Sequence, residues 1–208
     1  MGLYSDFIFP WLIERESNDP RLAAIRRSML RGVSGRILEI GFGTGADLPF
    51  YPPEVRRLVI VEPSAGMNRS AARHVAAWGG EIEPHRLAGE RLPFPDASFD
   101  TVVVAFLLCS VADPAAVLAE TRRVLRPGGA YHLLEHVISS DPRARAWQRR
   151  LDGLNAAVWC GCHLVRDTEP VIAAAGFRFD WIERGPLHSR GLMRPLLPGI
   201  WGRAVRAG

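Results

Sequence analysis

Three glycines at alternate positions, Gly41, Gly43 and Gly45, follow a short apolar run and form the strongest chemical signal in the sequence. Glycine adopts positive φ readily and lacks a Cβ, so a turn of this kind lets the backbone approach a ligand closely. Glu62 lies 21 positions after Gly41, at the end of a second apolar run. A carboxylate at this spacing can accept hydrogen bonds from the two hydroxyls of a ribose. Together the four residues predict a site for a nucleoside cofactor.

The class of nucleoside depends on residues around the turn, because the turn also fits the permissive dinucleotide fingerprint G-x-G-x-x-A. The third glycine gives G-x-G-x-G, and Glu39 precedes the turn by two positions, where it could hold an ammonium group. Gly89 and Glu90 form a second loop of the kind that flanks an adenine. We therefore expect S-adenosylmethionine rather than NAD, with its carboxylate at the free N–H groups of a helix that follows the turn. Glu62 would serve either cofactor equally.

Two histidines are candidates for a general base in methyl transfer. The reaction is an in-line displacement at a sulfonium carbon, and much of the catalysis can come from holding the nucleophile about 3–3.5 Å from the methyl carbon. A thiol acceptor must first lose its proton, since the thiolate is the nucleophile and a free thiol has a pKa of roughly 8.5. His136 follows the fifth predicted strand, and His163 lies in a Gly-Cys-His turn. Each could instead be a hydrogen-bonded structural histidine.

The acceptor end of the site is predicted from one cysteine and three tryptophans. Cys109 follows a buried strand, where it could line the pocket or pack as a small apolar residue. Trp11 and Trp147, together with Trp159, Phe7 and Leu12, could form an apolar cap over a lipophilic acceptor, or belong to the core. The Cys-x-Cys-His segment at 160–163 offers three soft ligands without an evident fourth, so we expect no metal site.

Composition and charge limit the possible partners. The 208 residues include 26 basic side chains, all of them arginine, and carry a formal net charge of +4. No aromatic-rich RNA motif or helix-turn-helix pattern accompanies this charge, so we expect no nucleic acid partner and at most peripheral contact with a membrane surface. Three cysteines without a secretion signal indicate reduced thiols in the cytoplasm. The longest apolar stretch, residues 102–112, is too short to cross a bilayer. We expect a small-molecule acceptor and a monomer or homodimer.

Alternating strand and helix patterns predict an α/β fold with a doubly wound, mostly parallel sheet and right-handed crossovers. Residues 1–34 should form a helical cap, and residues 35–208 the main domain. Expected strands lie at residues 36–40, 58–62, 82–87, 101–106 and 130–135, with a closing antiparallel pair at 177–183 and 200–206. Expected helices lie at residues 64–78, 113–126, 142–158 and 166–175.

Four segments are recognisable together: LEIGFGTG at 38–45, VEPS at 61–64, GERLPFPDASFDTVV at 89–103 and RVLRPGG at 123–129. Over about residues 35–137 the sequence resembles the class I S-adenosylmethionine-dependent methyltransferases of the ubiquinone/menaquinone-methyltransferase-like type. The resemblance implies a Rossmann-like, seven-stranded sheet of order 3-2-1-4-5-7-6 with strand seven antiparallel. It also implies that the glycines and Phe42 line the methionine and ribose. Pro63 and Met67 would lie against the adenine, and Phe106 and Leu107 beside the sulfonium.

A narrower resemblance is carried by DLPFYP at 47–52, LCSV at 108–111, LEHV at 134–137 and GCHL at 161–164. These segments are similar to those of the mammalian methyltransferase-like family of alkyl thiol methyltransferases and its small bacterial relatives, some of which are described as phospholipid N-methyltransferases. The resemblance implies S-methylation of a small lipophilic thiol, with S-adenosylhomocysteine as the other product. O- or N-methylation of a quinol, phenol or phospholipid headgroup, and a catalytically silent S-adenosylmethionine-binding protein, stay open as alternatives. We expect no counterpart of the mammalian N-terminal membrane anchor.

Overall fold

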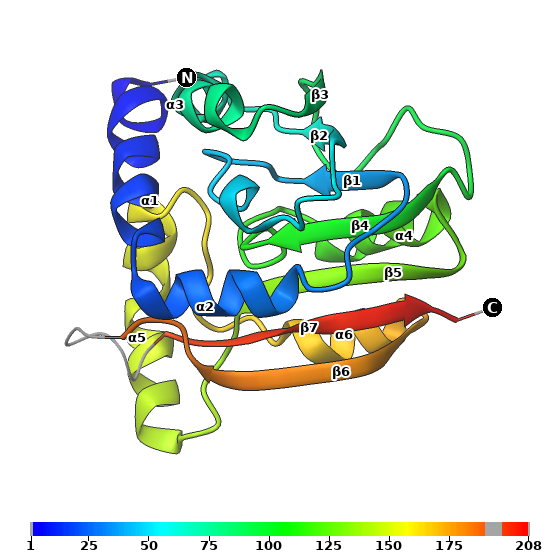
Figure 1. Cartoon of the computed structure of the whole chain (residues 1–208). Coiled ribbons are helices and arrows are strands. Elements are labelled where there is room, and N and C mark those ends of the chain that lie inside the picture. Colours follow the sequence, from blue (N-terminus) through cyan, green and yellow to red (C-terminus); the bar gives the residue numbers. More distant parts are fainter. Residues whose placement is uncertain (1, 190–196, 208) are drawn as a thin grey trace.

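A seven-stranded sheet runs through the centre of the computed structural model, which describes residues 2–189 and 197–207 (Figure 1). The strand order is β3-β2-β1-β4-β5-β7-β6, as predicted. β1 to β5 pair in parallel, and β7 runs antiparallel to both β5 and β6. The strands are β1 (Ile37–Ile40), β2 (Arg57–Val61), β3 (Glu81–His85), β4 (Phe99–Ala105), β5 (Leu125–His136), β6 (Phe177–Pro186) and β7 (Pro198–Arg206).

Helices flank this sheet on both faces (Figure 1). In chain order they are the π-helical turn η1 (Tyr4–Ile8), α1 (Phe9–Ser17), α2 (Pro20–Met29), the 3-10 turn η2 (Leu48–Phe50), α3 (Ala65–Trp78), α4 (Pro114–Val124), α5 (Pro142–Val158) and α6 (Thr168–Ala174). Polar side chains that accept a first-turn backbone N–H explain where α2 to α5 begin: Asp19, Ser64, Asp113 and Asp141. Within the described ranges, none of these helices has the length and apolar character that a bilayer crossing requires.

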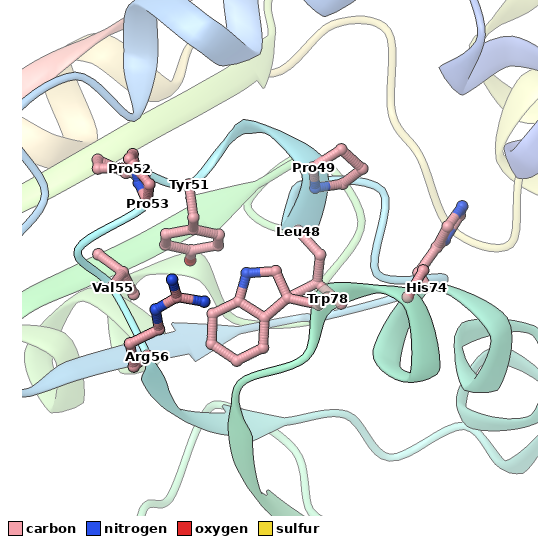
Figure 2. Close-up of a pocket in the computed structure, with 10 residues that line it drawn as sticks. Leu48, Pro49, Tyr51, Pro52, Pro53, Val55, Arg56, His74 and Trp78 are labelled. Carbon is pink, nitrogen blue, oxygen red and sulfur yellow. The ribbon is translucent and has the colours of Figure 1, made fainter.

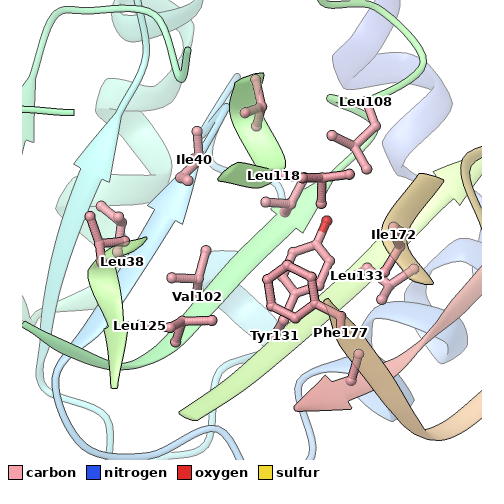
Figure 3. Packing of buried hydrophobic residues seen from close by; sticks show 14 of the residues in the cluster. Leu38, Ile40, Val102, Leu108, Leu118, Leu125, Tyr131, Leu133, Ile172 and Phe177 are labelled. Atoms are coloured by element: carbon pink, nitrogen blue, oxygen red, sulfur yellow. The ribbon is translucent and has the colours of Figure 1, made fainter. Parts of the chain in front are cut away.

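Two apolar clusters fill the two sides of the sheet, because successive strand residues point to opposite faces. Leu38 of β1 packs in one cluster with Leu118 of α4 and Ile172 of α6 (Figure 3). Ile37 belongs to the other cluster, which α2 completes with Leu22, Ile25 and Met29. α2 is thus part of the layer that covers the sheet, and the boundary at residue 34 between cap and main domain stays a prediction.

Two local predictions are wrong. The segment after the glycine turn contains η2 rather than a regular helix, because Pro49, Pro52 and Pro53 lack the N–H groups that a longer helix needs there. β5 begins at Leu125, so the Pro-Gly-Gly segment lies within the strand rather than before it. A register shift between Phe99 and Thr101 on β4 accommodates this irregular stretch.

Candidate active site

The glycine turn lies at the carboxyl end of β1, which is flanked by β2 and β4. Gly41, Gly43 and Gly45 have φ angles of 76°, 57° and 73°, a conformation that glycine adopts without strain. A Cβ added to Gly41 would lie 2.9 Å from Cδ1 of Leu107. The turn therefore packs on the segment that follows β4, and both border the edge where ligands bind in open α/β sheets.

Glu62 holds the turn from the end of β2. Its Oε2 accepts a 2.9 Å hydrogen bond from the N–H of Gly43, and its Oε1 accepts a 2.8 Å bond from the N–H of Ser64. Burial raises the pKa of this carboxyl group, although both backbone N–H groups favour its ionised form. A carboxylate oxygen has two lone pairs, so each oxygen can still accept a hydroxyl hydrogen bond from a ligand.

A cavity of about 430 Å³ opens at this edge of the sheet. It joins the nucleoside-binding candidates to His136 at the end of β5, whose side chain is buried. The predicted site residues that line this cavity are Gly41, Phe42, Gly43, Glu62, Met67, Phe106, Leu107, Cys109 and His136. The structure thus brings together residues from the ends of β1, β2, β4 and β5.

Five predicted cofactor residues lie outside the lining of this cavity: Glu39, Gly45, Pro63, Gly89 and Glu90. Glu39 is buried behind the turn, where it accepts a 2.7 Å hydrogen bond from the hydroxyl of Tyr51. Gly89 packs against the end of β1, since a Cβ added to it would lie 2.6 Å from Cγ2 of Ile40. Glu39 and Gly89 therefore support the strand and turn beside the cavity.

Three predicted acceptor-side residues also lie away from the cavity. The side chains of Trp11 and Trp147 are 59% and 52% exposed. On α1, the helical register turns Phe9 and Ile13 inward instead of Trp11. Trp159, the third tryptophan of the predicted cap, follows α5 and does line the cavity. His163 is directed to Asp152, with 2.9 Å between Nδ1 and Oδ2.

An arginine–aspartate pair that the sequence analysis missed lies in the cavity wall. Arg26 of α2 and Asp47 after the glycine turn are both buried, and Nη1 of Arg26 donates a 2.5 Å hydrogen bond to Oδ1 of Asp47. Nε of Arg26 is buried and has no hydrogen-bond partner among the described residues. A guanidinium in this position can bind a ligand carboxylate through its remaining N–H groups. Because α2 carries no cofactor motif, no local pattern identified Arg26.

The carboxyl groups near this pair are electrostatically linked. Burial raises the pKa of Glu39 well above its usual range, and the charge of Asp47 raises it further. Burial also raises the pKa of Asp47, although Arg26 opposes this shift. One arginine therefore faces two buried carboxyl groups, and a cationic ammonium group nearby would favour the ionised form of both.

The turn after β4 is fixed by Glu135 of β5. Oε1 of Glu135 accepts hydrogen bonds from the N–H groups of Leu107 and Leu108, and Oε2 accepts one from Cys109. Phe106 at the start of this turn has a φ of 56°, which is uncommon for a residue with a side chain. The buried carboxyl group thus satisfies three backbone donors and shapes the floor of the cavity.

The N-terminal helices close the cavity from above the sheet edge. Glu14 of α1 forms an ion pair with Arg73 and accepts a 3.0 Å hydrogen bond from Ser70, both on α3. At the other side, the Tyr4 hydroxyl donates a 2.5 Å hydrogen bond to the carbonyl of Val158, and the Phe9 ring packs edge-on against Trp159. η1 and α1 therefore bridge α3 and the end of α5.

A second cavity, of about 260 Å³, lies behind the glycine turn (Figure 2). Tyr51, Arg56, His74 and Trp78 are among its walls. Two of these side chains brace the turn, since Tyr51 contacts Glu39 and Nδ1 of His74 lies 2.8 Å from the carbonyl oxygen of Thr44. The residues predicted to act in the reaction lie elsewhere, so the larger cavity is the candidate active site.

Comparisons with known proteins agree with this geometry. Residues 38–133 match the model of a family described as "Methyltransferase domain". The chain is 36% identical over 186 residues to "Thiol S-methyltransferase TMT1B" of Rattus norvegicus, covering 85% of this chain and 74% of that protein. It is 31% identical to "Phosphatidylethanolamine N-methyltransferase" of Cereibacter sphaeroides, covering 89% of each.

A solved structure supports the fold independently. The crystal structure of the YcgJ protein from Bacillus subtilis superposes with a TM-score of 0.69 at 18% sequence identity, covering 90% of this chain and 98% of that one. At this identity the likeness concerns the arrangement of strands and helices.

Proposed function

The chain belongs to the class I S-adenosylmethionine-dependent methyltransferases, and from that premise we propose that it methylates the sulfur of a small lipophilic thiol. S-adenosylmethionine supplies an activated methyl group on a sulfonium and leaves as S-adenosylhomocysteine. The observation that carries the choice of acceptor is the buried imidazole of His136, which lines the same cavity as the glycine turn and Glu62. Imidazole is a suitable base for a thiol near neutral pH. The identity with a thiol S-methyltransferase supports the same acceptor.

The residues of the cavity fit S-adenosylmethionine. The missing Cβ of Gly41 lets the glycine turn pack against Leu107 in the cavity lining, and the free lone pairs of Glu62 suit two ribose hydroxyls. The guanidinium of Arg26 in the cavity wall suits the methionine carboxylate, in place of the helix N-terminus expected from the sequence. Asp47 in the cavity wall, with Glu39 behind it, suits the methionine ammonium.

The adenine is proposed to lie beyond Glu62, at the start of α3. Met67 lines the cavity there, and Pro63 directly follows Glu62. Gly89 and Glu90 follow β3, the neighbour of β2 at the sheet edge. We expect these residues to enclose the adenine ring between the ends of β2 and β3.

The acceptor end is proposed to lie between the β4 turn and the N-terminal helices. Phe106, Leu107 and Cys109 form one side, and Phe9, Ile13 and Trp159 the other. Such apolar walls exclude water and hold a lipophilic thiol in line with the methyl group, about 3–3.5 Å from the carbon. His136 would take the thiol proton at an imidazole nitrogen before the sulfur attacks.

The proposal is tested with a panel of acceptors. The protein is incubated with S-adenosylmethionine and alkyl or aryl thiols, and in parallel with amines, phenols and quinols of matching carbon skeleton. We expect mass spectrometry to show S-methyl products and stoichiometric S-adenosylhomocysteine. Turnover of an amine or hydroxyl acceptor without any thiol product would reject the thiol while leaving the methyltransferase assignment intact.

N-methylation of a phospholipid headgroup is the second candidate, and a feature of the surface favours it. Large apolar side chains just before and within η1, on α1 and on α5 are exposed: Leu3, Phe7, Ile8, Trp11, Trp147, Leu154 and Val158. The similarity to a phosphatidylethanolamine N-methyltransferase points the same way. Methylation of phosphatidylethanolamine in vesicles, with no thiol turnover, would establish this alternative. The cytoplasmic location and the monomeric or homodimeric state stay predictions.

A further inference from the structure

Two cysteine side chains from distant parts of the sequence meet in the wall of the active-site cavity. Cys109 follows β4 and Cys162 follows α5, and both line the cavity. Their Sγ atoms lie 3.6 Å apart, and all three thiols of the chain are free. The third, Cys160, is exposed at the rim of the same cavity. The proposed methyl transfer uses neither sulfur of the close pair as a reactant.

The backbone holds the two thiols side by side. The N–H of His163 donates a 2.9 Å hydrogen bond to the carbonyl of Cys109, which joins the two loops directly. The carbonyl of Cys162 accepts a 2.7 Å bond from Asn155 of α5, and the N–H of Cys109 is held by Glu135. The two thiols therefore lie on two loops that hydrogen bonds hold side by side. A bond between the sulfurs would need only a small local movement of these loops.

We propose that a hydroperoxide oxidises Cys109 and Cys162 to a reversible disulfide, and that this bond suppresses methyl transfer. The thiolate of Cys162 attacks the peroxide, the O–O bond breaks, and water or an alcohol leaves, which gives a sulfenic acid. The sulfur of Cys109 then attacks the Cys162 sulfur, the S–O bond breaks, and a second water leaves. Two thiols lose two electrons and two protons in total, and the peroxide takes them up.

The two sulfurs differ in a way that assigns these roles. The hydrogen bond with Cys109 lowers the pKa of Cys162, which is only partly buried. The same bond, together with burial, raises the pKa of Cys109. Cys162 is therefore the more ionised and more accessible thiol, and the thiolate is the species that reacts with peroxide. Cys109 is placed to resolve the sulfenic acid because its sulfur is already in contact.

The bond would act on the site through the β4 turn. A disulfide brings its sulfurs to about 2.05 Å, so the segment of Cys109 and the segment of Cys162 must move toward each other from the 3.6 Å separation. Leu107 and Leu108 share the Glu135 anchor with Cys109, so their positions would change as well. A low-molecular-weight thiol would restore the reduced pair by thiol–disulfide exchange.

The test uses the full-length protein and hydrogen peroxide. After a brief treatment, we expect intact mass to fall by about 2 Da, the mass of two hydrogen atoms, and peptide mapping to link Cys109 to Cys162. The initial rate of methyl transfer, measured after peroxide removal with the acceptor that shows turnover, should fall at least about tenfold and recover with dithiothreitol. Cys160→Ser, the matched control in the same cavity, should respond like the wild type.

Cys162→Ser should lose both the mass change of about 2 Da and the reversible loss of rate. Cys109→Ser should lose them too, and it serves as the second variant if Cys162→Ser folds poorly.

Failure of the disulfide proposal is distinguishable from failure of the proposed function, because intact mass and peptide mapping need no methyl acceptor. The 109–162 linkage together with a reversible loss of rate supports the proposal. It is overturned if the mass is unchanged, if Cys160 carries the linkage, or if the disulfide forms without loss of rate. Stable over-oxidation of Cys162 without a linkage would also overturn it.

Discussion

The two oxygen atoms of Glu62 make one backbone contact each, and this arrangement predicts a large role in cofactor binding. One contact fixes Gly43 of the glycine turn, and the other fixes Ser64 at the start of α3. Glu62→Ala should weaken S-adenosylhomocysteine binding by about 1–3 kcal/mol, because two hydroxyls lose a charged partner. Titration calorimetry measures this change. Glu81→Ala is the control, since its exposed side chain forms an ion pair with Arg57 away from the cavity lining; equal affinities of both variants would contradict the assignment.

His136 and His163 can be separated by their surroundings. His136 lines the cavity, whereas His163 is half-exposed and paired with Asp152. We expect His136→Ala to lower kcat at least about tenfold, as for loss of a general base, with little change in S-adenosylmethionine affinity. His163→Ala should have a smaller effect. Steady-state kinetics with a thiol acceptor checks both, and the opposite ranking would transfer the base role to His163.

At the residue scale, the sequence revealed positions that belong to motifs and missed those that depend on tertiary approach. The glycines and Glu62 were predicted because their spacing along one βαβ unit has a direct geometric meaning, whereas Met67 was implied by the family resemblance. Arg26 was missed because α2 carries no cofactor motif and reaches Asp47 only when it covers the sheet. Trp11 was placed in the pocket because its residue type suits an acceptor, yet type alone does not decide which face of α1 turns inward.

At the scale of elements, the β4 turn depends on β5 through one side chain. Glu135→Ala would leave the N–H groups of Leu107, Leu108 and Cys109 buried without their acceptor. Since each unsatisfied buried donor is costly, we expect the free energy of unfolding to fall by about 2–4 kcal/mol. Thermal and urea denaturation measure this loss. Glu135→Gln keeps the shape and one carbonyl oxygen, so it should lose less; an unchanged melting temperature for Glu135→Ala would refute the role.

The first and last residues of a helix or strand were predictable where a local sequence rule alone determines them. α5 has the expected bounds, because Asp141 caps it and its apolar residues recur at helical spacing. η2 replaces an expected helix because three prolines lie within and just after it. β5 starts early because pairing of Leu125 with Phe99 overrides the tendency of Pro-Gly-Gly to interrupt a strand. Pairing between strands joins residues that are distant in the sequence, so a local sequence pattern does not predict it.

At the scale of the whole molecule, buried carboxyl groups make stability depend on pH. Burial raises the pKa of four of them: Glu39, Asp47, Glu62 and Glu135. A carboxyl group whose pKa is higher in the folded than in the unfolded state favours folding below the unfolded pKa. That contribution is lost as pH rises through the folded pKa. The contribution of these four groups to the free energy of unfolding should therefore decline from about pH 4.5 upward.

Glu39→Gln tests this linkage, because the amide oxygen can still accept the Tyr51 hydrogen bond while one titrating group is removed. We expect its free energy of unfolding to decline less than that of the wild type between pH 5 and pH 8. Urea denaturation at several pH values gives the two slopes. Glu83→Gln is a suitable control, since the pKa of Glu83 is lowered rather than raised. A steeper decline for Glu39→Gln than for the wild type would reverse the sign and refute the argument.

The exposed apolar side chains of η1, α1 and α5 form a face that suits a membrane surface. The two segments adjoin, since Tyr4 bonds to Val158 and Phe9 packs on Trp159, and they lie at the same side of the molecule (Figure 1). Arginines lie over three of the exposed aromatic rings: Arg69 over Phe7, Arg15 over Trp11 and Arg150 over Trp147. Apolar rings with adjacent cations suit the interface of an anionic bilayer.

We therefore expect the protein to sediment with vesicles that contain anionic lipid, more than with neutral vesicles, and to dissociate as salt is raised. Trp11→Ser combined with Trp147→Ser should lower the bound fraction at least about threefold, because two interfacial rings are lost. Val171→Ser on α6 is the matched control, since that side chain is exposed on a different helix. Equal binding of the double variant and the control would show that this face does not contact lipid. In that case a lipophilic acceptor must reach the cavity from solution, and its rate of methylation should be independent of added vesicles.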